Sequence, residues 1–243
     1  MSGHNKWSQI KHKKAASDAK KAQSFSKLAK QISLAAKEGG GDPSANVALR
    51  MWMEKAKTVN MPIANIDKAV KRGTGELAGA EIKPFLYEAY GPGGVALLIE
   101  GATDNTNRTN SEVKHLLNKL GAKWAESGSV SYLFERKGLI FVDKTKTKKS
   151  ADDLEMAVIE AGASDTQWVE ENVLQAITEP DMLDLVQDGL KEAKLTIEDS
   201  LLGYLAKMEI EVDDEKTRQQ LANIFEALEE HEDVNSVYSN AKF

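Results

Sequence analysis

The chain has 243 residues, a formal net charge of −6 and no cysteine. A chain of this length can bury a substantial core and hold two or three domains. The absence of cysteine excludes disulfides, zinc–thiolate sites and thiol catalysis. No apolar run approaches the ~20 residues that a membrane-spanning helix needs.

The first residues lack the apolar core of a secretory signal, so we expect a cytoplasmic protein without a membrane partner. The alternative is a mitochondrial transit peptide, because the first 37 residues are poor in acids. Such peptides favour arginine, however, and the first arginine of this chain is Arg50.

Positive charge is concentrated at the amino terminus. Residues 1–37 hold nine lysines and one acidic residue, Asp18, so this segment carries +8 and the remainder of the chain carries −14. Such segregation predicts that the basic end binds a polyanion while the acidic body is held away from it. Nucleic acid is the main polyanion inside a cell. The charge pattern therefore favours a nucleic-acid-binding protein over a metabolic enzyme.

The first 80 residues are predicted to form a helical domain without a strand. Apolar side chains recur near a 3.6-residue period over 15–37, and Gly39-Gly40-Gly41 ends that helix. A second helix is expected from Asp42-Pro43 or Ser44 to about residue 59. A third, short helix is expected from Ile63 to Gly73.

Strands and helices alternate after residue 80. The patterns predict strands at 95–99, 130–134, 139–142, 173–177, 208–212 and 234–238, and helices at 108–120, 151–161, 181–193 and around 221–228. The strands at 130–134 and 139–142 are expected to flank a turn at Lys137-Gly138. This order fits ferredoxin-like units.

The predicted fold class is α+β: an N-terminal all-helical domain followed by two ferredoxin-like α+β domains. The predicted domains are residues 1–80, residues 81–135 together with 206–243, and an inserted domain at 136–205.

The lysine-rich arm is the first candidate site. Its lysines can neutralise phosphates and release counterions, and Trp7 can stack on an unpaired base. On a helix, Lys13, Lys20 and Lys27 share one face. The alternative is a solvated helix with Trp7 packed against the bundle, although a solvated face normally mixes both signs. The candidate residues are His4, Lys6, Trp7, Lys11, His12, Lys13, Lys14, Lys20, Lys21, Lys27 and Lys30.

The second candidate site is the polar loop between the strand at 95–99 and the helix at 108–120. Free N–H groups at a helix N-terminus bind phosphate, and Arg108 can hold a phosphate with two hydrogen bonds. Alternatively, the same side chains cap the helix and complete the turn. The candidate residues are Thr103, Asn105, Asn107, Arg108 and Thr109.

Tyr87 and Tyr90, before the turn at Gly91-Pro92-Gly93-Gly94, form the third candidate site. Their rings can stack on RNA bases. We favour the alternative, in which both lie on one face of a strand and pack.

Motifs of enzymes are absent from the sequence. Gly73-Thr74-Gly75 does not form a dinucleotide fingerprint, and no Walker loop, H-E-x-x-H motif or nucleophile elbow occurs. The four histidines lack metal-ligand spacing. We therefore expect no catalytic residue, metal, cofactor or small-molecule substrate.

Several of these segments together resemble the YebC family, whose relatives include a mitochondrial translational activator of cytochrome oxidase. The resemblance covers essentially the whole chain. One departure is Gly121-Ala122-Lys123-Trp124-Ala125, where the family usually has a second glycine and a residue smaller than tryptophan. The segments that carry the resemblance are Gly3–Trp7, Ile10–Lys14, Gly41–Pro43, Asn60–Pro62, Lys71–Gly75, Tyr87–Ala96, Thr103–Asn105, Arg108-Thr109 and Asp233–Asn240.

The resemblance implies a helical domain followed by two α+β domains, in a cytoplasmic, non-enzymatic regulator of gene expression. It implies either DNA binding in transcriptional control or action on ribosomes during translation. The arm shows no recognition helix with base-reading spacing, which favours structured RNA or a ribosome over operator DNA. The alternative function is a protein-interaction adaptor whose acidic α+β domains bind a basic partner.

Overall fold

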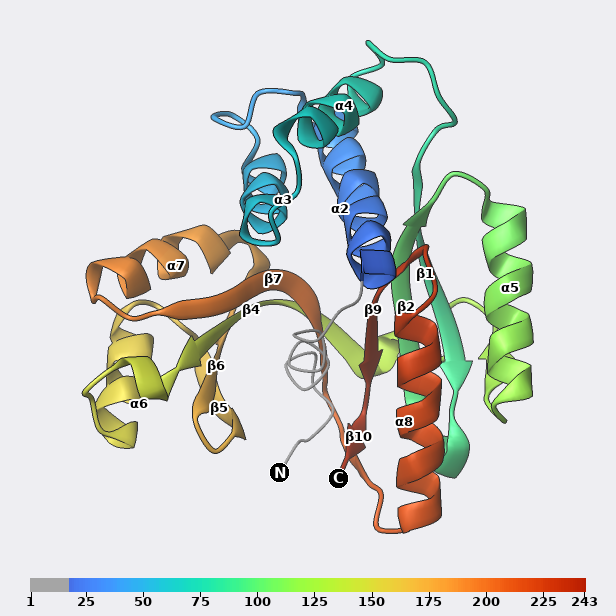
Figure 1. Cartoon of the computed structure of the whole chain (residues 1–243). Coiled ribbons are helices and arrows are strands. Elements are labelled where there is room, and N and C mark those ends of the chain that lie inside the picture. The colour runs from blue at the N-terminus through green and yellow to red at the C-terminus, as the bar shows by residue number, and fades with distance from the viewer. Residues whose placement is uncertain (1–17) are drawn as a thin grey trace.

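A computed structural model describes the backbone of residues 18–243 and the side chains from Ala22 onward. In Figure 1 the N-terminal helices stand beside sheets that carry the later helices. The helices are α2 (Asp18–Gly39), α3 (Val47–Thr58), α4 (Ile63–Gly73), α5 (Thr106–Lys119), α6 (Ala151–Glu160), α7 (Leu183–Glu192) and α8 (Glu215–Glu229). The strands are β1 (Lys83–Tyr90), β2 (Ala96–Thr103), β3 (Lys123–Ala125), β4 (Phe134–Asp143), β5 (Asp165–Glu170), β6 (Val173–Thr178), β7 (Ile197–Ala206), β8 (Ile210–Glu211), β9 (Val234–Ser239) and β10 (Ala241–Lys242).

Helices α2, α3 and α4 pack around their own apolar core, whose centre is Ile32, Leu49 and Ile66. Ile32 belongs to the apolar stripe that the 3.6-residue period predicted for the first helix. Asn46 begins α3 by accepting a hydrogen bond from the Leu49 amide at 3.0 Å. The predicted N-terminal helical region is confirmed.

The first sheet has the strand order β3-β1-β2-β9. Helices α5 and α8 cover one of its faces, and Leu97, Val113 and Leu221 lie in the shared core. The sheet combines strands that precede residue 126 with β9, which begins at Val234. Its core therefore joins segments more than 100 residues apart.

The second sheet has the order β5-β6-β4-β7, and α6 and α7 cover one face. In chain order these elements run β4-α6-β5-β6-α7-β7, which is the ferredoxin-like arrangement. The predicted α+β class is therefore confirmed. All strands of this sheet lie within residues 134–206. Such a pattern arises when one domain is inserted into another, and the predicted domain boundaries stay a prediction.

The predicted turn at Lys137-Gly138 was wrong, because β4 runs through both residues. A Cβ added at Gly138 would lie 2.2 Å from Thr178 Oγ1 on the neighbouring strand β6. The glycine therefore permits a close approach of two strands rather than a turn. Residues 131–133, predicted as strand, instead form a short 3-10 turn that leads into β4.

The predicted strands did not include β1, β3, β5, β7 and β10. Strand β7 carries Glu198, Asp199 and Ser200 in succession, and β5 carries only one buried residue, Val169. Both lie at an edge of the second sheet, where a strand does not need an alternating apolar pattern.

Among the described helices, none combines the length and the apolar composition needed to cross a membrane.

Gly73 sets how closely α4 approaches α2. A Cβ at this position would lie 2.2 Å from the Ser33 carbonyl oxygen. We expect Gly73→Ala to lower the free energy of unfolding by about 1–3 kcal/mol, because the two helices must separate. Thermal unfolding followed by circular dichroism measures the loss. Gly75→Ala is the comparison: Gly75 has a φ of 83° but open space around it, so only its backbone strain, about 1 kcal/mol, is expected.

Candidate nucleic-acid interface

The carboxylate of Asp233 gathers several of the predicted site residues. Asp233 lies just before β9 and is fully buried. Its Oδ2 accepts hydrogen bonds from Thr109 Oγ1 at 2.6 Å, Arg108 Nη2 at 2.9 Å and Thr103 Oγ1 at 3.1 Å. Its Oδ1 accepts a hydrogen bond from Lys30 Nζ. We call these five residues the Asp233 network.

The Asp233 network holds its carboxylate in the charged form. Burial alone raises the pKa of Asp233, but hydrogen bonds from Lys30, Thr109 and Arg108 outweigh burial and lower this pKa to about 2. The hydrogen bond to Asp233 in turn raises the pKa of Arg108. The Asp233 carboxylate is therefore charged at neutral pH, and it forms ion pairs with Lys30 and Arg108.

The loop at residues 103–105 positions this network. Asn105 caps α5 by accepting a hydrogen bond from the Arg108 amide at 3.1 Å, and Thr103 Oγ1 accepts one from the Asn105 amide at 2.9 Å. These bonds place Arg108 and Thr109 in the first turn of α5. They match the alternative reading of this loop, in which the polar side chains cap a helix and complete a turn.

The predicted loop residues differ in how far they are exposed to solvent. Thr103 and Thr109 are buried, and Arg108 is engaged with Asp233. These three side chains form hydrogen bonds within the protein, and their contact with phosphate stays a prediction. Asn105 and Asn107 are exposed and line a shallow hollow of about 270 Å³ at the start of α5. Their contact with nucleic acid stays a prediction.

Helix α2 docks on the carboxyl end of α8. Lys27 donates to the carbonyl oxygen of Glu229, and Gln23 donates to that of Glu230. Lys30 also donates to the carbonyl oxygen of Glu232, at 3.3 Å. The last carbonyls of a helix lack intrahelical partners and attract cations. Two of the predicted arm lysines therefore attach α2 to the body of the protein. Figure 1 shows the start of α2 beside the end of α8.

His231 extends this cluster toward the surface. Its Nδ1 accepts a hydrogen bond from the Asp233 amide at 3.1 Å, and its Nε2 lies 3.1 Å from Glu112 Oε2. Neither His231 nor Asp233 was among the predicted site residues. Asp233 belongs to the C-terminal segment that carries the family resemblance, which is the one signal in the sequence that pointed to it.

The two tyrosines of β1 point to opposite faces of the strand. They are three residues apart, so the expectation that they share one face was wrong. The Tyr87 ring stacks on Phe85 at 4.4 Å and lies 4.8 Å from Trp124. Tyr90 donates from its hydroxyl group to the Ser129 carbonyl oxygen at 2.9 Å. Trp124, the departure from the family pattern, thus completes an aromatic cluster with Tyr87.

Most of the arm lies outside the described residues. This applies to His4, Lys6, Trp7, Lys11, His12, Lys13 and Lys14, and to the side chains of Lys20 and Lys21. Within the part of the chain that the structure describes, no three acidic, histidine or cysteine side chains are grouped so that they could hold a metal ion.

Comparison with known proteins gives matches along nearly the whole chain. Residues 5–76 match the family model "TACO1/YebC protein N-terminal domain", and residues 82–241 match "TACO1/YebC second and third domain". A protein from Halothermothrix orenii is 45% identical over 99% of this chain and 94% of its own length. One from Petrotoga mobilis is 50% identical over 91% and 87%. Both relatives are named "Probable transcriptional regulatory protein".

A solved structure shares the fold. The crystal structure of a conserved hypothetical protein from Aquifex aeolicus matches with a TM-score of 0.89 and 42% sequence identity. The match covers 98% of this chain and 97% of that one.

Proposed function

Since the chain belongs to the TACO1/YebC family, we propose that it is a nucleic-acid-binding regulator of gene expression that catalyses no reaction. The names of its relatives support a role in regulation. The observation that carries nucleic-acid binding is the charge segregation, with nine lysines and one acid in residues 1–37 of a chain whose net charge is −6. A polyanion attracts this end and repels the rest.

The proposed contact is made by the lysines that precede the docked part of α2. Lys27 already binds an acceptor at the carboxyl end of α8, and Lys30 binds Asp233. We therefore assign phosphate binding to Lys6, Lys11, Lys13, Lys14, Lys20 and Lys21, with Trp7 and the two arm histidines beside them. Lys27 and Lys30 contribute by holding α2 in place.

The proposed target is structured RNA, with the ribosome as the leading candidate, in the cytoplasm. Lysine–phosphate contacts position a protein on nucleic acid but carry no sequence information. A protein that relies on them is better suited to a large folded RNA than to one operator sequence. The transcriptional names of the relatives make duplex DNA the second candidate.

Charge reversal in the arm tests this function. We expect the variant Lys11→Glu, Lys13→Glu, Lys14→Glu to bind RNA about 10–100-fold more weakly, because three phosphate contacts become repulsions. Fluorescence anisotropy with a labelled RNA hairpin and a matched DNA duplex, each over a series of salt concentrations, measures the change and compares the two targets.

The matched control reverses three exposed lysines elsewhere, as Lys148→Glu, Lys149→Glu, Lys216→Glu. It changes the net charge equally and is expected to retain most of the affinity. Sedimentation of both variants in a lysate gradient then asks whether the arm carries the protein to ribosomal particles. Unchanged affinity of the arm variant for both RNA and DNA would exclude the proposal.

A further inference from the structure

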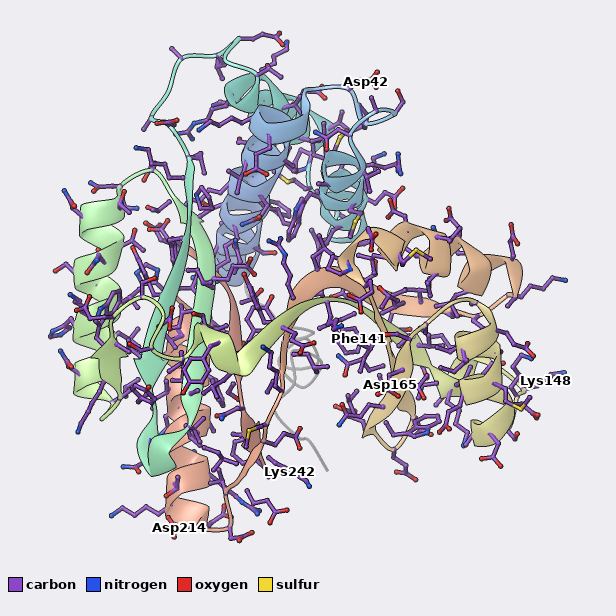
Figure 2. All side chains as sticks on the ribbon, turned by 180° about the vertical axis from the view of Figure 1, so that it is seen from behind. Asp42, Phe141, Lys148, Asp165, Asp214 and Lys242 are labelled. Carbon is purple, nitrogen blue, oxygen red and sulfur yellow. The ribbon has the colours of Figure 1, made fainter. Side chains whose placement is uncertain are left out.

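The second sheet and its helices contain a stretch of sequence in which every charged residue is acidic. Residues 151–190 hold eleven aspartate and glutamate residues and no lysine, arginine or histidine. The stretch covers α6, β5, β6 and α7 up to Leu190, and Lys149 and Lys191 flank it. In both views this end of the molecule, marked by Asp165 in Figure 2, lies opposite α5. A phosphate backbone is repelled by such a surface.

Apolar side chains are exposed within this acidic surface. Met156 and Ile159 are three positions apart on α6, so they lie on one face of the helix. The exposed fractions of Met156 and Ile159 are 61% and 46%. They line a shallow hollow of about 380 Å³ between α6 and β5, together with Asp152, Glu155, Glu160 and Thr166. We call this hollow the α6 groove.

The carboxylates at the rim of the α6 groove are only partly used inside the protein. Glu155 accepts a hydrogen bond from Trp168 Nε1. Asp152 and Glu160 are exposed, and no ion pair reaches either side chain from the described residues. The groove thus combines exposed apolar side chains with available negative charge beside them. Exposed apolar side chains bordered by polar residues are typical of a protein-binding surface.

We propose that the α6 groove binds a lysine- and arginine-rich protein segment that carries large apolar side chains. The apolar side chains of the segment would cover Met156 and Ile159, and its cations would pair with Asp152 and Glu160. Charge complementarity selects this partner, because nucleic acid and anionic membranes share the sign of the rim. The arm and this groove then give the protein two surfaces of opposite charge, which serve different partners.

A synthetic peptide of arginine, lysine and leucine is the probe. We expect it to bind the full-length protein, and we expect Met156→Ser, Ile159→Ser to weaken that binding about tenfold or more, as loss of two buried apolar contacts requires. Asp152→Lys, Glu160→Lys should weaken it by a similar factor, with a smaller dependence on salt. Isothermal titration calorimetry measures both.

Two controls separate this groove from general charge attraction. Met208→Ser removes a methionine that is 70% exposed outside the acidic stretch, and it should leave the affinity unchanged. A peptide with serine in place of leucine should bind much more weakly. If that peptide binds as tightly, or if the Met156 and Ile159 substitutions have no effect, the α6 groove is not a docking site. The arm variant tests the proposed function separately, since it leaves α6 untouched.

Discussion

Asp233→Ala is expected to lower the free energy of unfolding by about 3–5 kcal/mol. The substitution removes a fully buried carboxylate and leaves Lys30 and Arg108 without the partner that compensates for their partial burial. It also leaves the hydroxyl groups of Thr103 and Thr109 without an acceptor on Asp233. Urea unfolding followed by tryptophan fluorescence and by circular dichroism measures the loss.

A neighbouring carboxylate is the matched control for Asp233. Glu232 also pairs with Arg108, at 3.4 Å, but its side chain is 57% exposed. We expect Glu232→Ala to cost at most about 1 kcal/mol, because water replaces an exposed ion-pair partner. If the two substitutions had equal effects, burial of the Asp233 network would not be what stabilises it.

The pKa of Asp233 predicts how this contribution depends on pH. A folded-state pKa of about 2, below the ordinary value of 3.8, means that the carboxylate stabilises the fold above about pH 4. The stabilisation disappears as the pH falls through about 2, and it amounts to about 2 kcal/mol. The difference in stability between the wild type and Asp233→Ala should therefore be constant at neutral pH and shrink between pH 4 and pH 2.

Glu88→Ala is expected to lower the free energy of unfolding by about 3 kcal/mol or more. Glu88 is a buried carboxylate on β1 that accepts three backbone hydrogen bonds, from Gly128 at 2.7 Å, Val130 at 2.6 Å and Ser131 at 2.9 Å. Without the carboxylate, three N–H groups lose their acceptor, at about 1 kcal/mol or more for each. The loop before β4 should then exchange its amide hydrogens faster, which hydrogen-exchange mass spectrometry measures.

Glu135→Ala is the control for Glu88, because Glu135 also lies in a strand but has an exposed side chain. It is expected to change the free energy of unfolding by less than about 1 kcal/mol.

Burial raises the pKa of Glu88, but the three backbone hydrogen bonds outweigh burial and leave the pKa below its ordinary value. The Glu88 contribution is thus present above about pH 4.5. A loop that keeps its protection in Glu88→Ala would show that other contacts order it.

The sequence was sufficient for features that depend on neighbours along the chain. Apolar residues repeat every three or four positions in α5, where Val113 and Leu117 are buried, and this period alone identifies a helix. The repeated helices and strands after residue 80 were enough to predict an α+β fold. The excess of lysine in residues 1–37 is likewise a property of composition, and it carries the proposed function without reference to the fold.

Tertiary structure decided what depends on residues distant in sequence. The local sequence at Gly138 predicts a turn, but β4 continues through this residue. Thr178 on the adjacent strand leaves no room for a side chain, so the position requires glycine. In the sequence, Lys30 and Arg108 have no recognisable partner, yet both bind Asp233, which is 203 and 125 residues away. A local pattern does not specify such pairs, because only the packing of α2, α5 and β9 brings them together. The sequence therefore determined the charge, the helices and the fold class, and the packing decided which cations are already neutralised within the protein.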